Sequence, residues 1–314
     1  MLHSNRAGAR RVLCALAVSA AAFFAVPTPS GQAPDKPGIL LMAHGGRPSW
    51  NAQVVELASK IDPKIPVEVA FGMASRQTIQ AAVDRLVARQ VTRVVAVPLF
   101  ISSHSSVFTS TEYLLGARRD APPDLAVFAR MSHGSGGHDH SAHGAAPADG
   151  TKPVAAPVPV KMTAALDSHQ VVGDILIDRA RALSREPARE AVVLVAHGPV
   201  PDEDNRRWLE EMAVLSERIR NSAPYASVDY LTVRDDAPPA IKDVATAGLR
   251  DVVRRRSGEG RRVLVVPLLL SFGGIEQGIR KRLEGLDFIM SQQGLMPDSR
   301  IGDWVLQSAA ASNP

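Results

Sequence analysis

Two histidines occupy the same short motif, each directly after a run of apolar residues. His44 ends the segment "GILLMAH" (38–44) and His197 ends "AVVLVAH" (191–197), and a glycine follows each of them. Continuous apolar runs of this length are typical of strands buried on both faces of a parallel sheet. Because ligands of such sheets bind beyond the carboxyl ends of the strands, both imidazoles are predicted to lie at a ligand-binding edge.

A third histidine is predicted to lie at the same edge as His44. His104 follows the apolar segment "RVVAVPLF" (93–100), which has the pattern of another buried strand. Two neutral imidazoles in one cleft could bind a divalent metal such as Co, Fe, Ni or Zn, and they could also accept protons. The predicted catalytic and metal-binding residues are therefore His44 and His104.

His197 is the weaker candidate for a metal ligand. The residues after it, "GPVPDEDN" (198–205), are acidic, and the loop "SFGGIEQG" (271–278), which corresponds to the His104 loop, contains no histidine. A single histidine at a strand end is often a hydrogen-bonded structural residue. His169, in "LDSHQ", is predicted to cap or pack at the start of a helix.

The segment after His44 is suited to an anionic substrate. Glycines permit a close approach of the backbone, and a helix N-terminus favours anionic groups. With the serines beside His104, these positions make up the predicted substrate-binding set: Gly45, Gly46, Arg47, Asn51, Ser103 and Ser106.

The stretch 132–160 is rich in Gly, Ala, Pro and His. It is predicted to be a mobile loop, because it cannot bury enough apolar surface to fold alone. Its composition is that of a low-specificity metal-chelating tract. The predicted accessory metal ligands are His133, His138, His140 and His143.

Strands and amphipathic helices alternate twice along the chain, which predicts an internal duplication. The third strands carry the same Val-Pro-Leu step, in "TRVVAVPLFIS" (92–102) and "RRVLVVPLLLS" (261–271). The predicted fold class is two tandem three-layer α/β/α domains with parallel sheets. The first spans residues 38–187, with 132–160 as an insert and one more strand and helix near its end, and the second spans residues 190–309.

The N-terminus has the features of an export signal. Arginines precede an apolar run from Val12 to Val26, which is too short to span a bilayer comfortably. Residues 1–36 are therefore predicted to be a signal peptide and leader, and the mature protein to be periplasmic or extracellular. The alternative is an uncleaved membrane anchor.

Composition argues against other classes of function. Removing the three arginines of the leader lowers the formal charge from +4 to +1, and aromatic residues make up only 4% of the chain, so nucleic-acid binding is not expected. The single cysteine, Cys14, lies in the leader, which leaves no thiolate site in the mature protein. The sequence contains no phosphate-binding loop, dinucleotide fingerprint or nucleophile elbow.

The order of these motifs resembles the sirohydrochlorin cobaltochelatase and ferrochelatase family, the class II chelatases of the CbiX type, in its long form with two fused repeats. The resemblance spans Gly38 to about Leu286 and includes the strand ending in "AHG", "VEVAF" (67–71) and "VVAVPLFIS" (94–102) followed by a histidine. It implies a lyase that inserts Co(II), Fe(II) or Ni(II) into a tetrapyrrole without ATP, in a cleft between two lobes, as a step of tetrapyrrole or cobalamin biosynthesis.

The resemblance also implies roles for single residues. His44 would ligate the incoming metal and accept a pyrrole proton, and a histidine of the loop after the third strand would complete the site. The family's loop is closer to "SAGGHV", which puts the expected histidine at Ser106, two residues after His104. Gly72 and Met73 stand where the family often has an acidic residue after the second strand.

The leading prediction is metal insertion, with a divalent metal as substrate and no organic cofactor. The alternative is an exported metal- or tetrapyrrole-binding protein, a carrier or buffer without turnover, which the export signal and the His-rich loop favour. A third option is a structural module that binds a partner protein. The expected partners are a tetrapyrrole and a divalent metal, and the chain is expected to be a monomer with two pseudo-symmetric domains or a homodimer.

Overall fold

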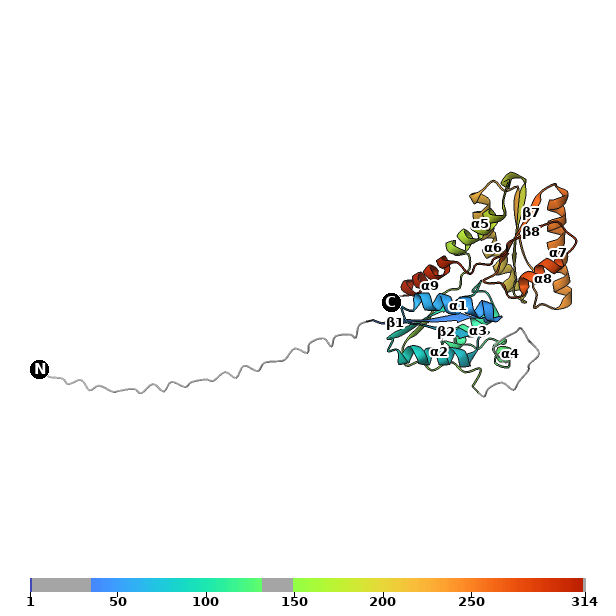
Figure 1. Cartoon of the computed structure of the whole chain (residues 1–314). Helices are drawn as coiled ribbons and strands as arrows, with labels where there is room; N and C mark the ends of the chain where they lie inside the picture. The colour runs from blue at the N-terminus through green and yellow to red at the C-terminus, as the bar shows by residue number, and fades with distance from the viewer. Residues whose placement is uncertain (2–34, 132–148, 313–314) are drawn as a thin grey trace. The chain divides into compact units, whose positions relative to one another are not determined.

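The computed structural model describes residue 1, residues 35–131 and residues 149–312 (Figure 1). Residues 2–34 of the predicted signal peptide and the predicted accessory ligands His133, His138, His140 and His143 lie outside the described residues. None of the described helices is long and apolar enough to cross a membrane.

The apolar runs of the sequence form two parallel sheets of four strands each. The sheets have the orders β2-β1-β3-β4 and β6-β5-β7-β8, and every neighbouring pair is parallel. The first contains β1 (Pro37–Ala43), β2 (Val67–Phe71), β3 (Arg93–Pro98) and β4 (Val160–Met162). The second contains β5 (Glu190–Ala196), β6 (Ser227–Thr232), β7 (Arg262–Leu268) and β8 (Ile289–Met290). The predicted pair of parallel α/β domains is confirmed.

Helices connect the strands and cover the sheets. Those between β1 and β4 are α1 (Pro48–Ile61), α2 (Arg76–Ala88), α3 (Ser106–Leu114) and α4 (Leu125–Phe128). Those after β4 are α5 (Gln170–Leu183), α6 (Asp202–Ser222), α7 (Pro239–Gly258), α8 (Ile275–Arg282) and α9 (Ser299–Ala311), with a 3-10 turn at Pro187–Arg189. Side chains alternate along β1, so that Ile39 and Leu41 face one hydrophobic cluster and Leu40 and Met42 another.

Helices α5 and α9 each lie on the other half of the molecule. The sequence pattern assigned the helix at 170–183 to the first half, but α5 packs against α6 and β7 of the second sheet, whereas α9 returns to α1 and β3 of the first. All of these helices share one hydrophobic cluster with both sheets. Periodicity identifies the apolar face of a helix but not the sheet that this face covers.

The two crossing helices are structural counterparts. His169 caps α5 by accepting a hydrogen bond from Val171 N through its side chain, and Asp298 caps α9 by accepting one from Arg300 N. The capping role predicted for His169 is confirmed. Each helix has glycine at its fourth residue, Gly173 and Gly302, so the duplication extends to the last described helix.

A buried carboxylate anchors the linker between the halves. Glu190, at the start of β5, is 1% exposed and accepts hydrogen bonds from Arg185 N at 2.8 Å, from Arg262 Nη1 at 2.6 Å and from the Ser184 hydroxyl. Burial alone would raise the pKa of Glu190, but these hydrogen bonds outweigh it and lower that pKa.

We expect Glu190→Gln to destabilise the fold by about 3 kcal/mol, because the variant leaves the Arg262 guanidinium without its buried partner. Urea denaturation measures this difference, and Glu186→Gln, at an exposed position of the same linker, is the control. The pKa of Glu190 is lower in the folded state than in the unfolded state. The wild type is therefore more stable than the variant by the full amount at a pH above the usual pKa of a carboxyl group, and this difference in stability disappears as the pH falls through the lowered pKa. Equal stability of both variants at neutral pH would contradict the anchoring role.

Candidate active site

His44 lies at the carboxyl end of β1, directly after the last strand residue, and its side chain is exposed. Its ring stands edge-on to the ring of Phe100, with centroids 4.7 Å apart and an interplanar angle of 77°. Phe100 follows β3 and is 4% exposed. The pairing of β1 with β3 thus brings the exposed imidazole of His44 into contact with the buried ring of Phe100.

The turn after His44 is stabilised internally. Asn51, in the first turn of α1, accepts a hydrogen bond from Gly46 N at 2.8 Å through Oδ1. Gly45 has a φ of 78° and lies close to the Phe71 side chain, so only glycine fits here without strain. In this structure Asn51 therefore shapes the turn, while the exposed Arg47 is the charged side chain beside it.

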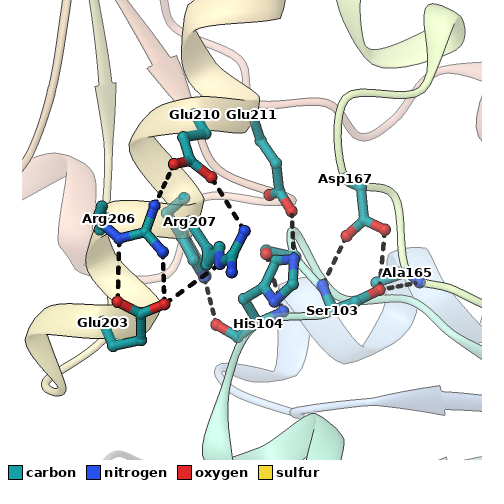
Figure 2. Close-up of polar contacts among 11 residues, drawn as sticks. Ser103, His104, Ala165, Asp167, Glu203, Arg206, Arg207, Glu210 and Glu211 are labelled. Carbon is teal, nitrogen blue, oxygen red and sulfur yellow. Dashed lines mark hydrogen bonds and ion pairs between the residues drawn. The ribbon is translucent and has the colours of Figure 1, made fainter.

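His104 lies in the loop after β3, and the second half of the chain contacts it at two points (Figure 2). Trp208 Nε1, on α6, donates a hydrogen bond to His104 O at 2.7 Å. Glu211 Oε1, one turn further along α6, lies 3.6 Å from His104 Nε2. The His104 amide also donates to Ser102 Oγ at 3.0 Å. The side chain of His104 remains 46% exposed.

Ser103 is held by Asp167, which lies in the turn before α5 (Figure 2). Asp167 accepts from Ser103 N at 2.6 Å and from Ser103 Oγ at 2.9 Å, and Ser103 Oγ accepts from Ala165 N at 2.9 Å. The Ser103 hydroxyl is thus engaged as donor and acceptor within the loop. Ser106 is the first residue of α3, behind the capping side chain of Ser105.

Two carboxyl groups of α6 near the His104 loop have raised pKa values. Burial raises the pKa of Glu211 to about 7; a hydrogen bond from Ser102 opposes this rise, and the charges of Asp167 and Glu210 add to it. Burial also raises the pKa of Asp204, which the charge of His104 opposes. Both carboxyl groups therefore hold protons more readily than exposed ones do.

Sequence reasoning missed Trp208 and Glu211 as site residues. A signal was present: Glu211 interrupts the apolar side of α6, between the buried residues Trp208 and Met212. A carboxylate in that place must be paired or protonated.

His197 has a different environment from His44. Its Nε2 lies 3.3 Å from Asp236 Oδ2, and its carbonyl accepts from Arg234 N at 2.6 Å. The Arg234 guanidinium donates to Pro199 O at 3.2 Å and lies 2.8 Å from Asp202 Oδ1, so it fills the turn after His197. His197 is engaged in this local network through its ring nitrogen and its carbonyl.

The structure describes no group of three or more His, Cys, Asp or Glu side chains, among residues 35–131 and 149–312, that could hold a metal ion. It does place His44 and the His104 loop beyond the carboxyl ends of the adjacent strands β1 and β3.

Comparisons with known proteins agree with this architecture. The CbiX family model matches residues 38–183. The structure of SirB from Bacillus subtilis with Fe3+ is 18% identical, with a TM-score of 0.58 over 88% of this chain and 97% of that chain. SirB from Bacillus subtilis subspecies spizizenii in complex with cobalt is 15% identical, with a TM-score of 0.55 over the same shares of the two chains.

A third similar structure is CbiX, described as the terminal enzyme for biosynthesis of siroheme in denitrifying bacteria. It is 14% identical, with a TM-score of 0.51 over 89% of this chain and all of that chain. The search of curated protein sequences finds no significant match. The first half of the chain thus matches the CbiX family model in sequence, and both halves are similar in fold to the SirB and CbiX structures.

Proposed function

We propose that this protein inserts a divalent metal ion, Co, Fe or Ni, into a sirohydrochlorin-like tetrapyrrole without ATP. The observation that carries the proposal is the position of His44: an exposed imidazole beyond β1, against Phe100, in the half that matches the CbiX family. The similar structures that contain Fe3+ and cobalt support a transition metal as the cargo.

The chemistry requires a ligand that releases the metal and an acceptor for protons. When the metal bonds to the pyrrole nitrogens, two N–H bonds break and two protons leave the macrocycle. A neutral imidazole binds borderline divalent metals and accepts a proton near neutral pH. His44 supplies both properties at an exposed position, and His104 is the second imidazole of the proposed site.

The predicted leader at residues 1–36 would place this activity outside the cytoplasm, in the periplasm or beyond. The accessory histidines of the stretch 132–160 would then collect metal ions loosely. A carrier or buffer would share these features, so turnover is the property that distinguishes the two functions.

We expect His44→Ala to lower the rate of cobalt insertion by about 100-fold or more, because it removes a metal ligand and proton acceptor. The measurement is the absorbance change of sirohydrochlorin with Co(II) under anaerobic conditions. His169→Asn is the matched control, since asparagine also caps a helix and His169 caps α5 through its side chain. A wild-type rate equal to the protein-free rate would refute metal insertion, and binding of both ligands without product would assign the carrier function.

We expect deletion of residues 132–145 to reduce the number of Co, Ni or Zn ions bound per chain, while the insertion rate at saturating metal stays within about twofold, because loose accessory ligands raise only the local metal supply. Calorimetric titration of the full-length and deleted proteins measures the first quantity, and the absorbance assay measures the second. An unchanged stoichiometry would contradict the accessory role of His133, His138, His140 and His143.

A further inference from the structure

The loop that carries His104 is held by a helix of the other half. Trp208 and Glu211 are one turn apart on α6, and they contact opposite ends of the same residue: the indole N–H bonds to the backbone carbonyl of His104, and the carboxyl group lies beside its ring nitrogen Nε2 (Figure 2). Glu211 also receives a hydrogen bond from Ser102. Backbone and imidazole are thus restrained separately.

The loop after β7 in the second half can be compared with the His104 loop after β3. Ser102 and Ser271 stand at the same distance after Pro98 and Pro267, and Ser271 Oγ donates to Gln53 Oε1 of α1 at 2.8 Å. Each third-strand loop therefore contacts the first helix of the opposite half through a serine. Only the loop of the first half carries a histidine.

We propose that Trp208 and Glu211 are positioning residues for His104, so that the second half of the chain supports a histidine that the first half supplies. This inference rests on the proposed function and deepens it, because it assigns a task to the half whose own histidine turn is filled by Arg234. Neither residue needs to touch the tetrapyrrole.

The physical benefit is preorganisation. An exposed side chain such as His104 otherwise changes rotamer on a picosecond-to-nanosecond timescale, and ordering it when metal and macrocycle arrive would cost entropy in every turnover. Groups that orient a metal-binding histidine through its second nitrogen commonly change activity or metal affinity by about 10- to 100-fold when they are replaced. Trp208 restrains the carbonyl of His104, and Glu211 restrains Nε2 of its ring. The edge of the ring opposite Nε2 is then directed away from Glu211.

The test uses Trp208→Phe, which removes the indole N–H but keeps an aromatic ring, and Glu211→Gln, which keeps the shape but removes the charge. The controls are Trp50→Phe, at a tryptophan of α1 that is 8% exposed like Trp208, and Glu210→Gln, at the exposed neighbour of Glu211. All four are made in the full chain, and thermal melting reports their folding.

We expect Trp208→Phe and Glu211→Gln each to lower kcat by about tenfold, with KM for the tetrapyrrole within threefold, whereas the controls keep the wild-type kcat. In substrate-free protein labelled with 15N-histidine and assigned with His104→Gln, the His104 ring signals should broaden or shift in both positioning variants only. If Trp50→Phe lowers kcat as much as Trp208→Phe does, the effect is loss of packing and the positioning role is wrong.

The NMR readout separates this inference from the proposed function. If the wild type has no chelatase activity but the His104 signals change in both variants, the proposed function fails while the restraint of His104 stands. If the wild type is active and the His104 signals match those of the wild type in both variants, the positioning role is overturned.

Discussion

The parallel pairing of β1 with β3 is the constraint on which the site depends. Met42 lies opposite Pro98 in the register, so both strands end at the same level and the residues that follow them meet. The contact between the His44 and Phe100 rings is a direct result. Parallel strands bring their carboxyl ends to one edge of a sheet, where loops and helix N-termini converge.

The same register recurs in the second half, where Val195 lies opposite Pro267. The backbone therefore offers the same edge twice, and the side chains decide what each edge can do. In the first half, Gly45 and Gly46 form the turn after an exposed imidazole. In the second, Arg234 bonds to the carbonyls of the turn after His197.

The crossing helices turn two similar halves into one molecule. Glycines let them approach closely: a Cβ on Gly302 would lie 3.2 Å from Leu57 Cδ1, and one on Gly173 would meet the Arg218 side chain. Helices α1, α5, α6 and α9 then share one hydrophobic cluster with both sheets. A loop of one half can contact a helix of the other at hydrogen-bond distance only if such packing fixes their separation.

Sequence patterns predicted those features of the fold that depend on local periodicity. The apolar runs identified β1, β2 and β3. The patterns also placed His44 beyond a strand end. They assigned α5 to the wrong half, because the choice of sheet depends on tertiary packing.

The contact of His104 with Trp208 was beyond such patterns, since it joins residues 104 positions apart. No periodic signal reports a hydrogen bond from an indole to a distant loop carbonyl. Glu211 could be recognised in part from the sequence, because it is a carboxylate on the apolar side of α6. What the sequence could not show is the loop that this carboxylate faces.

The first helices of the two halves explain why the chain is asymmetric. Asn51 and Asn205 are each the fourth residue of their helix. Asn51 accepts a hydrogen bond from Gly46 N in the turn after His44, and Asn205 accepts one from Thr232 Oγ1 at the end of β6. Counted from these asparagines, Val54 and Leu57 of α1 stand where Trp208 and Glu211 stand in α6.

Val54 and Leu57 are apolar and lie in the hydrophobic cluster that α1 shares with α9, so at these two positions α1 cannot donate a hydrogen bond or a charge to the opposite loop. Two identical halves would need the same helix face to serve both as packing surface and as polar support. Fusion in one chain removes that conflict, because each copy of the helix can take one of the two tasks. In α6, the helix takes the second task at Trp208 and Glu211, which contact the histidine loop of the first half.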